Sequence, residues 1–260
     1  MYFCGNIFSE KSIEKMNKRV LLVLLYSAVC GGMLAENRIE DNLNTLHEWK
    51  AGDVVSAESV RCFGGIERCF ATMEIPDAVW AKMQGKSYKE NKYIKRDDLR
   101  YLKILHVDKD QKIHLGEMIC NKHIADILLR IFRQLYDANY PIERMVLPDE
   151  YDADDELQMR DNNTSCFCYR VVARSATLSY HARGLAVDLN PLYNPYYKKK
   201  PDGTVFVQPK TAAPYIDRTK SFPYKIDVQD LAYRLFIQNG FTWGGGWRNS
   251  KDYQHFEYKL

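Results

Sequence analysis

Hydrophobic and polar positions from residue 99 to 135 predict a β-hairpin followed by a helix. Leu99 to Val107 has the pattern of a strand, Asp108-Lys-Asp110-Gln that of a turn, and Lys112 to Leu115 that of the partner strand. Asn121 can then cap a helix, because apolar residues recur every three or four positions at Ile124, Ile127, Leu128, Ile131, Phe132 and Leu135.

The second half of the chain alternates short strands, loops and one more helix. Apolar runs predict strands over 146–147, 167–172, 185–189 and 254–258, and a helix that starts at Asp227 and stops at Gly240. Residues 149–165 form an acidic polar loop of a length that is often functional, and the proline-rich residues 193–224 suggest an extended loop without a buried pattern. This mixture predicts an α+β fold, an antiparallel sheet with flanking helices.

Composition bounds the organisation of the chain. Its 260 residues, 46% hydrophobic and 27% charged, suit one compact domain with a small N-terminal appendage. A formal net charge of +3 is too weak to argue for a nucleic-acid partner. We expect residues 36–97, which include Trp49, Phe63 and Trp80, to pack onto a main domain formed by residues 98–260.

The N-terminus has the features of an export signal. Asn17-Lys18-Arg19 precedes an apolar run from Val20 to Val29, and small residues follow up to Ala35. We therefore expect residues 1–35, with Met16 as an alternative start, to be a signal peptide that directs the protein to the periplasm or cell envelope. The run is short for a membrane span, so the mature chain should have none. An uncleaved anchor and a lipid on Cys30 are the alternatives.

Removal of that signal would leave five cysteines. Cys62 and Cys69, separated by a short loop with two glycines, are the expected disulfide pair in an oxidising compartment. The one-residue gap between Cys166 and Cys168 is not the usual spacing of a structural zinc site, so these two are expected in the core.

Candidate chemistry is concentrated in two motifs, Ser179-Tyr-His-Ala-Arg-Gly-Leu-Ala-Val-Asp188 and Asp252-Tyr-Gln-His255. His181, Asp188 and His255 can supply three ligands to Zn²⁺ and leave a fourth position for water, as in catalytic sites. Asp252 lies three residues before the last histidine and could take the proton of that water. The other central histidines, His106, His114 and His123, lack such company and are expected to be structural.

Together the two motifs resemble the signature of the M15 family of zinc peptidases, over roughly residues 98–260. That family contains D-alanyl-D-alanine carboxypeptidases and dipeptidases and L-alanyl-D-glutamate endopeptidases, and its fold is shared by the signalling domain of hedgehog proteins. The resemblance implies that His181, Asp188 and His255 bind zinc and that Asp252 is the general base. Gly246 departs from it, since relatives often carry Asp there.

The resemblance also implies an arginine that steadies the substrate carbonyl or carboxylate. Arg170 and Arg174 are the candidates, and we favour Arg170 as the catalytic residue and Arg174 for substrate binding. Ser179, Tyr253 and Trp247 are further candidates for substrate binding, although Ser179 also suits an orienting role in the turn. Glu257, two residues after His255, could hold that histidine from behind or cap the strand.

The sequence thus predicts an exported zinc-dependent metallopeptidase that hydrolyses peptidoglycan stem peptides, as a carboxypeptidase or an endopeptidase. A different class remains open, in which the chain is a catalytically inactive, zinc-stabilised binding module of the cell envelope. The third interpretation is a structural envelope protein with a chance match to the motifs. Which bond is cut, and the oligomeric state, do not follow from the sequence.

Overall fold

The computed structural model describes residues 37–170 and 178–260. The expected signal peptide, Cys30 and Arg174 lie outside these residues. None of the helices in the described part is both long enough and apolar enough to cross a membrane.

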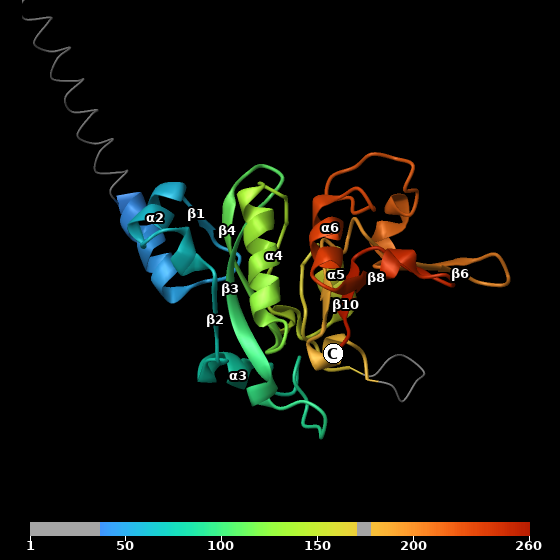
Figure 1. Ribbon diagram of the computed structural model, residues 1–260, viewed down its shortest axis with the longest axis horizontal. Coiled ribbons are helices and arrows are strands. Elements are labelled where there is room, and N and C mark those ends of the chain that lie inside the picture. Colours follow the sequence, from blue (N-terminus) through green and yellow to red (C-terminus); the bar gives the residue numbers. More distant parts are fainter. Residues whose placement is uncertain (1–36, 171–177) are drawn as a thin grey trace, which may run out of the picture.

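The first half of the chain is built on a four-stranded antiparallel sheet with the order β1-β4-β3-β2 (Figure 1). Its strands are β1 (Val54–Val55), β2 (Ala71–Met73), β3 (Leu99–Val107) and β4 (Ile113–Asn121). β3 is the predicted strand, and β4 is its hairpin partner but runs six residues beyond the predicted end at Leu115. The Oδ1 atom of Asp108 closes the turn by accepting the backbone N–H groups of Asp110 and Lys112, at 2.9 and 3.0 Å.

Helices cover both faces of this sheet. The predicted amphipathic helix is α4 (Ala125–Asp137), which packs its buried face against β3 and against α6 (Leu231–Gln238) (Figure 1). Asn121 accepts the backbone N–H of His123 at 3.1 Å, so it stabilises the turn before α4 rather than its first residue. α6 begins later than predicted, because Asp230 rather than Asp227 accepts the backbone N–H of Ala232 at 2.8 Å.

The segment before β3 contributes side chains to the core. It contains a helix over residues 37–48, α2 (Ala57–Cys62) and α3 (Asp77–Met83). Leu46 and Trp49 join a buried cluster with Leu105 of β3 and Leu115 of β4.

Two smaller antiparallel sheets form the C-terminal half. One has the order β5-β10-β8, with β5 (Ala186–Asp188), β8 (Phe241–Trp243) and β10 (His255–Tyr258). The other has the order β7-β6-β9, with β6 (Tyr196–Lys199), β7 (Val205–Gln208) and β9 (Lys251–Asp252). Helices with antiparallel sheets confirm the α+β class, although three sheets replace the single one expected.

Two of the predicted strands are wrong within the described residues. Residues 146–147 and 167–170 form no strand, because their backbone groups bond to scattered partners rather than to one neighbouring strand. The N–H of Val146 donates to the side chain of Asn163 at 2.9 Å, and the N–H groups of Phe167 and Tyr169 donate to the carbonyls of Ile119 and Ser87.

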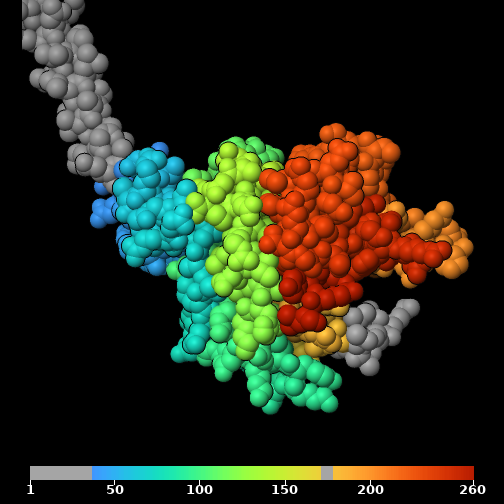
Figure 2. Space-filling model, in the orientation of Figure 1, coloured from blue at the N-terminus to red at the C-terminus, as the bar shows by residue number. Residues whose placement is uncertain are grey.

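The proline-rich segment is not a plain loop. β6 and β7 form a hairpin through the turn Pro201-Asp202-Gly203, and this hairpin projects from the body of the molecule (Figures 1 and 2). An Asp-Gly pair between strands is a common hairpin signal, and Gly203 has a φ of +84° that suits glycine. The same segment also contains a short 3-10 helix, Lys210–Tyr215.

The expected disulfide between Cys62 and Cys69 is absent, and both cysteines are free thiols. The thiol of exposed Cys62 lies 3.8 Å from Glu58 Oε1, whereas buried Cys69 directs its thiol to the carbonyl of Gly65 at the same distance. The two side chains therefore have separate partners.

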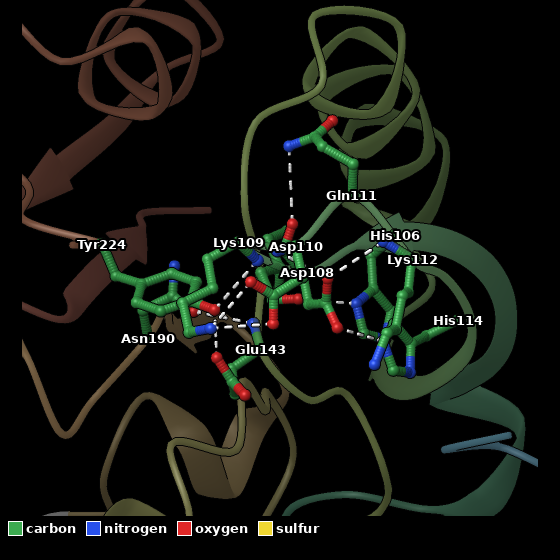
Figure 3. A network of polar contacts seen from close by, with 11 residues as sticks. His106, Asp108, Lys109, Asp110, Gln111, Lys112, His114, Glu143, Asn190 and Tyr224 are labelled. Atoms are coloured by element: carbon green, nitrogen blue, oxygen red, sulfur yellow. Dashed lines mark hydrogen bonds and ion pairs between the residues drawn. The ribbon is translucent and has the colours of Figure 1, made fainter. Parts of the chain in front are cut away.

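A polar network connects the β3–β4 turn to the second half of the chain (Figure 3). The imidazole of His114 lies 2.9 Å from Asp108 and stacks on the ring of His106, with centroids 5.2 Å apart. The hydroxyl of Tyr224 donates to Glu143 and accepts the backbone N–H of Lys109. We refer to His106, Asp108, His114, Glu143 and Tyr224 below as the turn network.

Candidate metal centre

Strand register brings two of the predicted ligands together. β5 and β10 are antiparallel, and His255 lies directly opposite Asp188. Residues opposite each other on adjacent strands project to the same face of a sheet, so the two side chains meet. His181 comes from the 3-10 turn His181–Arg183, which ends at Gly184 with a φ of +66°.

Gly184 is required by space as well as by conformation. A Cβ atom at this position would lie 2.6 Å from the backbone nitrogen of Asn121, at the end of β4. The backbone of the His181 turn therefore rests directly on the first sheet, and the N–H of Asn121 donates to the carbonyl of Gly184 at 2.8 Å. This contact fixes the position of the turn relative to the core.

Three potential ligand atoms converge in the buried pocket. His255 Nδ1 lies 3.0 Å from Asp188 Oδ1, and His181 Nε2 lies 3.1 Å from His255 Nδ1 and 3.2 Å from Asp188 Oδ2. One ligand atom from each residue lies within 4.8 Å of the others. Two imidazole nitrogens and one carboxylate oxygen form a donor set that suits Zn²⁺ and leaves a coordination position open.

The outward-facing nitrogens of both histidines also have partners. His181 Nδ1 lies 2.7 Å from the carbonyl of Cys166, which accepts its proton and leaves Nε2 free for a metal. His255 Nε2 lies 3.3 Å from Glu257 Oε2. Such contacts fix the tautomer and the orientation of metal-binding imidazoles.

The ionisation of the three groups reflects their contact. Burial lowers the pKa of His181. Burial also opposes the charge on His255, but hydrogen bonds to Asp188 and Glu257 raise its pKa to about 10. Burial works against the Asp188 carboxylate as well, yet the contacts with His181 and His255 hold its pKa well below the usual range. These shifts favour an ionised Asp188 beside a neutral His181 and a protonated His255.

Asp252 lies beside this group and has an unsatisfied oxygen. Its Oδ1 atom is buried and has no hydrogen-bond partner. Burial raises the pKa of Asp252 to about 7; the charge of Asp188 adds to this effect and that of His255 opposes it. A buried polar atom without a partner is costly, and it indicates a site for water or a ligand.

Gly244 makes the close approach around Asp252 possible. A Cβ atom on Gly244 would lie 2.7 Å from the backbone oxygen of Asp252, 2.9 Å from its Cβ and 3.2 Å from the Cβ of His255. By contrast, a Cβ atom on Gly246, two residues later, would meet nothing within 4 Å.

Arg170, in the loop before the His181 motif, lines a cavity that the two ligands His181 and Asp188 also line. The pocket is lined by His181, Asp188 and Arg170 together with residues of α5 (Asp155–Arg160). The guanidinium of Arg170 forms an ion pair with Asp155. The sequence predicts residues 149–165 as an acidic polar loop of a length that is often functional, and the structure adds that Asp155 and Gln158 of this segment line the pocket.

The remaining residues predicted to bind substrate differ in how close they lie to the His-Asp-His group. Ser179 Oγ accepts the backbone N–H of Ala182 at 3.0 Å and so stabilises the turn that carries His181. The ring of Trp247 lies 5.4 Å from that of His255 and forms part of its surroundings. Tyr253 instead packs in an aromatic group with Tyr197 and Trp243 and under the guanidinium of Arg218, 4.4 Å from its ring centroid.

The geometry thus defines a buried His-Asp-His centre with a carboxylate and an arginine beside it. Residues 173–258 match a family model described as D-alanyl-D-alanine carboxypeptidase, of the M15 peptidases. The match confirms the resemblance of this segment to the M15 peptidases, which are metallopeptidases. Comparison with curated proteins and with solved structures gives no match.

Proposed function

We propose that this protein is an exported zinc metallopeptidase that hydrolyses peptidoglycan stem peptides, at a D-Ala-D-Ala or an L-Ala-D-Glu bond. The proposal is carried by the convergence of His181, Asp188 and His255 with their ligand atoms within 4.8 Å of one another. The donor set fits Zn²⁺, and the unpaired buried oxygen of Asp252 fits a role beside it. A bound Zn²⁺ would act as a Lewis acid on the scissile carbonyl and would acidify water.

The chain's own residues divide the remaining work. Asp252 accepts a proton from the attacking water and returns it to the leaving amine, a role that its unpaired buried Oδ1 atom is free to take. Arg170 donates charged hydrogen bonds to the carbonyl oxygen as negative charge develops on it. His181 and His255 are oriented by Cys166 and Glu257, so the site is ordered before the substrate arrives.

The test combines metal analysis with product analysis. We expect the purified protein to contain one zinc per chain and to release peptides or alanine from defined muropeptides, and mass spectrometry of the products identifies the bond. Asp252→Ala should lower turnover by about 10²–10⁴-fold while zinc stays bound, because a general base contributes about that much. Asp97→Ala, which removes an exposed carboxylate, is the matched control.

The outcomes separate the peptidase from a binding module. Full activity in Asp252→Ala would contradict its assignment as base. A protein that binds zinc and muropeptides but releases no product would be a zinc-stabilised binding module, and a protein without zinc would be neither.

A further inference from the structure

A continuous chain of hydrogen bonds connects the metal ligand Asp188 to Arg170. Ser165 and Asp188 exchange backbone hydrogen bonds of 3.1 and 2.9 Å. Ser165 Oγ donates to Gln158 Oε1 at 3.1 Å, and Gln158 Nε2 donates to Asp155 Oδ1 at 3.0 Å. The other oxygen of Asp155 forms the ion pair with Arg170.

Burial makes the first part of this chain rigid. Gln158 and Ser165 are 4% and 9% exposed, respectively, so their polar atoms depend on each other for hydrogen bonds. Because the amide of Gln158 accepts from Ser165 on one side and donates to Asp155 on the other, its orientation is determined. The buried side chain of Gln158 therefore fixes the position of the Asp155 carboxylate at the start of α5.

The second part of the chain faces the pocket. The side chains of Asp155 and Arg170 are 24% and 39% exposed, and both line the cavity that contains His181 and Asp188. A guanidinium has five N–H donors in a planar fork, and one carboxylate engages at most two of them. The contact with Asp155 can therefore fix the plane of Arg170 and still leave donors for a substrate.

We infer that Asp155, held by Gln158, is the positioning residue that orients Arg170 toward the carbonyl or carboxylate of the substrate. This inference rests on the proposed peptidase function. A free arginine side chain loses rotamer entropy when it is ordered. The ion pair meets this cost before the substrate binds, so that the donors of Arg170 are preorganised for the charge that develops in the transition state.

Asp155 has an obvious alternative role, because a carboxylate in a pocket could bind a substrate ammonium group directly. The two roles differ in how the variants combine. If Asp155 acts only through Arg170, its removal has no further effect once Arg170 is gone. If it contacts the substrate, the two losses multiply.

The experiment is a double-mutant cycle on the zinc-loaded full chain with a defined muropeptide. We expect Asp155→Asn to lower kcat about 10–100-fold with little change in KM, because a small misplacement of a catalytic group costs that much. Arg170→Ala should cost at least as much, and the double variant no more than Arg170→Ala alone. Asp155→Glu, which keeps the charge, should retain more activity than Asp155→Asn.

Controls separate positioning from a general effect on structure. Glu156→Gln removes the next carboxylate of α5, whose Oε1 accepts the N–H of Lys210, and should leave turnover unchanged. Zinc content and thermal midpoint should match the wild type in each variant. If Asp155→Asn fails to fold, Gln158→Leu replaces it in the same cycle. This variant removes the hydrogen bond that holds Asp155, and so tests the same series of contacts from its buried end.

Two results would overturn the inference. One is full activity of Asp155→Asn, and the other is a multiplied loss in the double variant, which would assign Asp155 to direct substrate binding. A wild type without turnover on any of these muropeptides would instead overturn the proposed function, and this inference with it.

Discussion

Two regions of the molecule each place two histidines beside one aspartate. One is the metal centre, with His181, Asp188 and His255, and the other is the part of the turn network that contains His106, Asp108 and His114. Both trios are largely buried. They nevertheless differ in the direction of their ligand atoms. In the first trio, the three ligand atoms face one another. Among the residues that the structure describes, His181, Asp188 and His255 form a group whose geometry could hold a metal ion.

In the turn network the same atoms are directed elsewhere. The rings of His106 and His114 stack with an interplanar angle of 11°, and His114 Nε2 lies 2.9 Å from Asp108 Oδ2. His106 Nδ1 contacts the carbonyl of Ile142 at 2.8 Å, and Asp108 accepts two backbone N–H groups of its own turn. The comparison shows that residue types alone do not make a metal site; the backbone must aim their lone pairs at one point.

The largest expected effect contrasts the two aspartates. Asp188→Ala removes a ligand and should abolish both stoichiometric zinc binding and turnover. Asp108→Ala should keep both, but lower the free energy of unfolding by about 1–3 kcal/mol because buried hydrogen-bond partners are left unpaired. Metal analysis and urea denaturation measure the two effects. Loss of zinc in Asp108→Ala would break the contrast.

The next prediction compares Glu257, whose carboxylate contacts His255, with Glu143, whose carboxylate accepts from Tyr224. Glu257→Gln should weaken zinc affinity by about 10–100-fold, since a partner of a metal-binding imidazole typically contributes that much. Glu143→Gln, in the turn network, should leave zinc affinity unchanged. Competition with a chromophoric chelator measures both. Equal zinc affinity in Glu257→Gln and the wild type would show that His255 is oriented without Glu257.

Acid should affect the turn network through His106. Burial, together with the nearby His114 and Arg144, lowers the pKa of His106 from 6.5 to about 3. The unfolded chain therefore binds the proton more readily, and the stability gained from a neutral His106 is complete above pH 6.5 and lost as the pH falls toward 3. From pH 6.5 to 5 we expect a loss of about 2 kcal/mol.

The variant His106→Asn isolates this effect, because its amide can donate to Ile142 without titrating. The difference in unfolding free energy between wild type and variant, measured in chelator at several pH values, should shrink on acidification. A difference that is constant with pH would show that His106 does not titrate in this range.

The last contrast concerns two glycines of one loop. Gly244→Ala places a Cβ against the backbone of Asp252 and the Cβ of His255, and should cost about 1–3 kcal/mol of stability and lower turnover. Gly246→Ala meets open space and should change stability by less than about 0.5 kcal/mol. Thermal unfolding and muropeptide turnover measure both, and equal behaviour of the two variants would contradict the crowding at Gly244.

Patterns of apolar residues in the sequence predicted the helices and strands whose burial follows a regular spacing along the chain. The strand Leu99–Val107 follows from its mainly apolar run, which is buried on both faces of the sheet. Helix α4 follows from the three- and four-residue spacing of its apolar residues, which matches one buried face. The β6–β7 hairpin was not predicted, because the prolines of residues 193–224 suggested an extended loop. Asp202-Gly203 was nevertheless a usable turn signal. The strands expected at 146–147 and 167–170 failed because apolar runs are also buried as irregular backbone.

By itself, the sequence determined the chemical identity of the candidate centre: His181, Asp188, His255 and Asp252 are read from two short motifs. Only the tertiary structure decided that these residues meet, since Asp188 and His255 lie 67 positions apart and are joined by the register of β5 and β10. It also decided that Asp155 and Gln158 belong beside Arg170. Hydrogen bonds between distant segments depend on how those segments pack, and no local pattern records that packing.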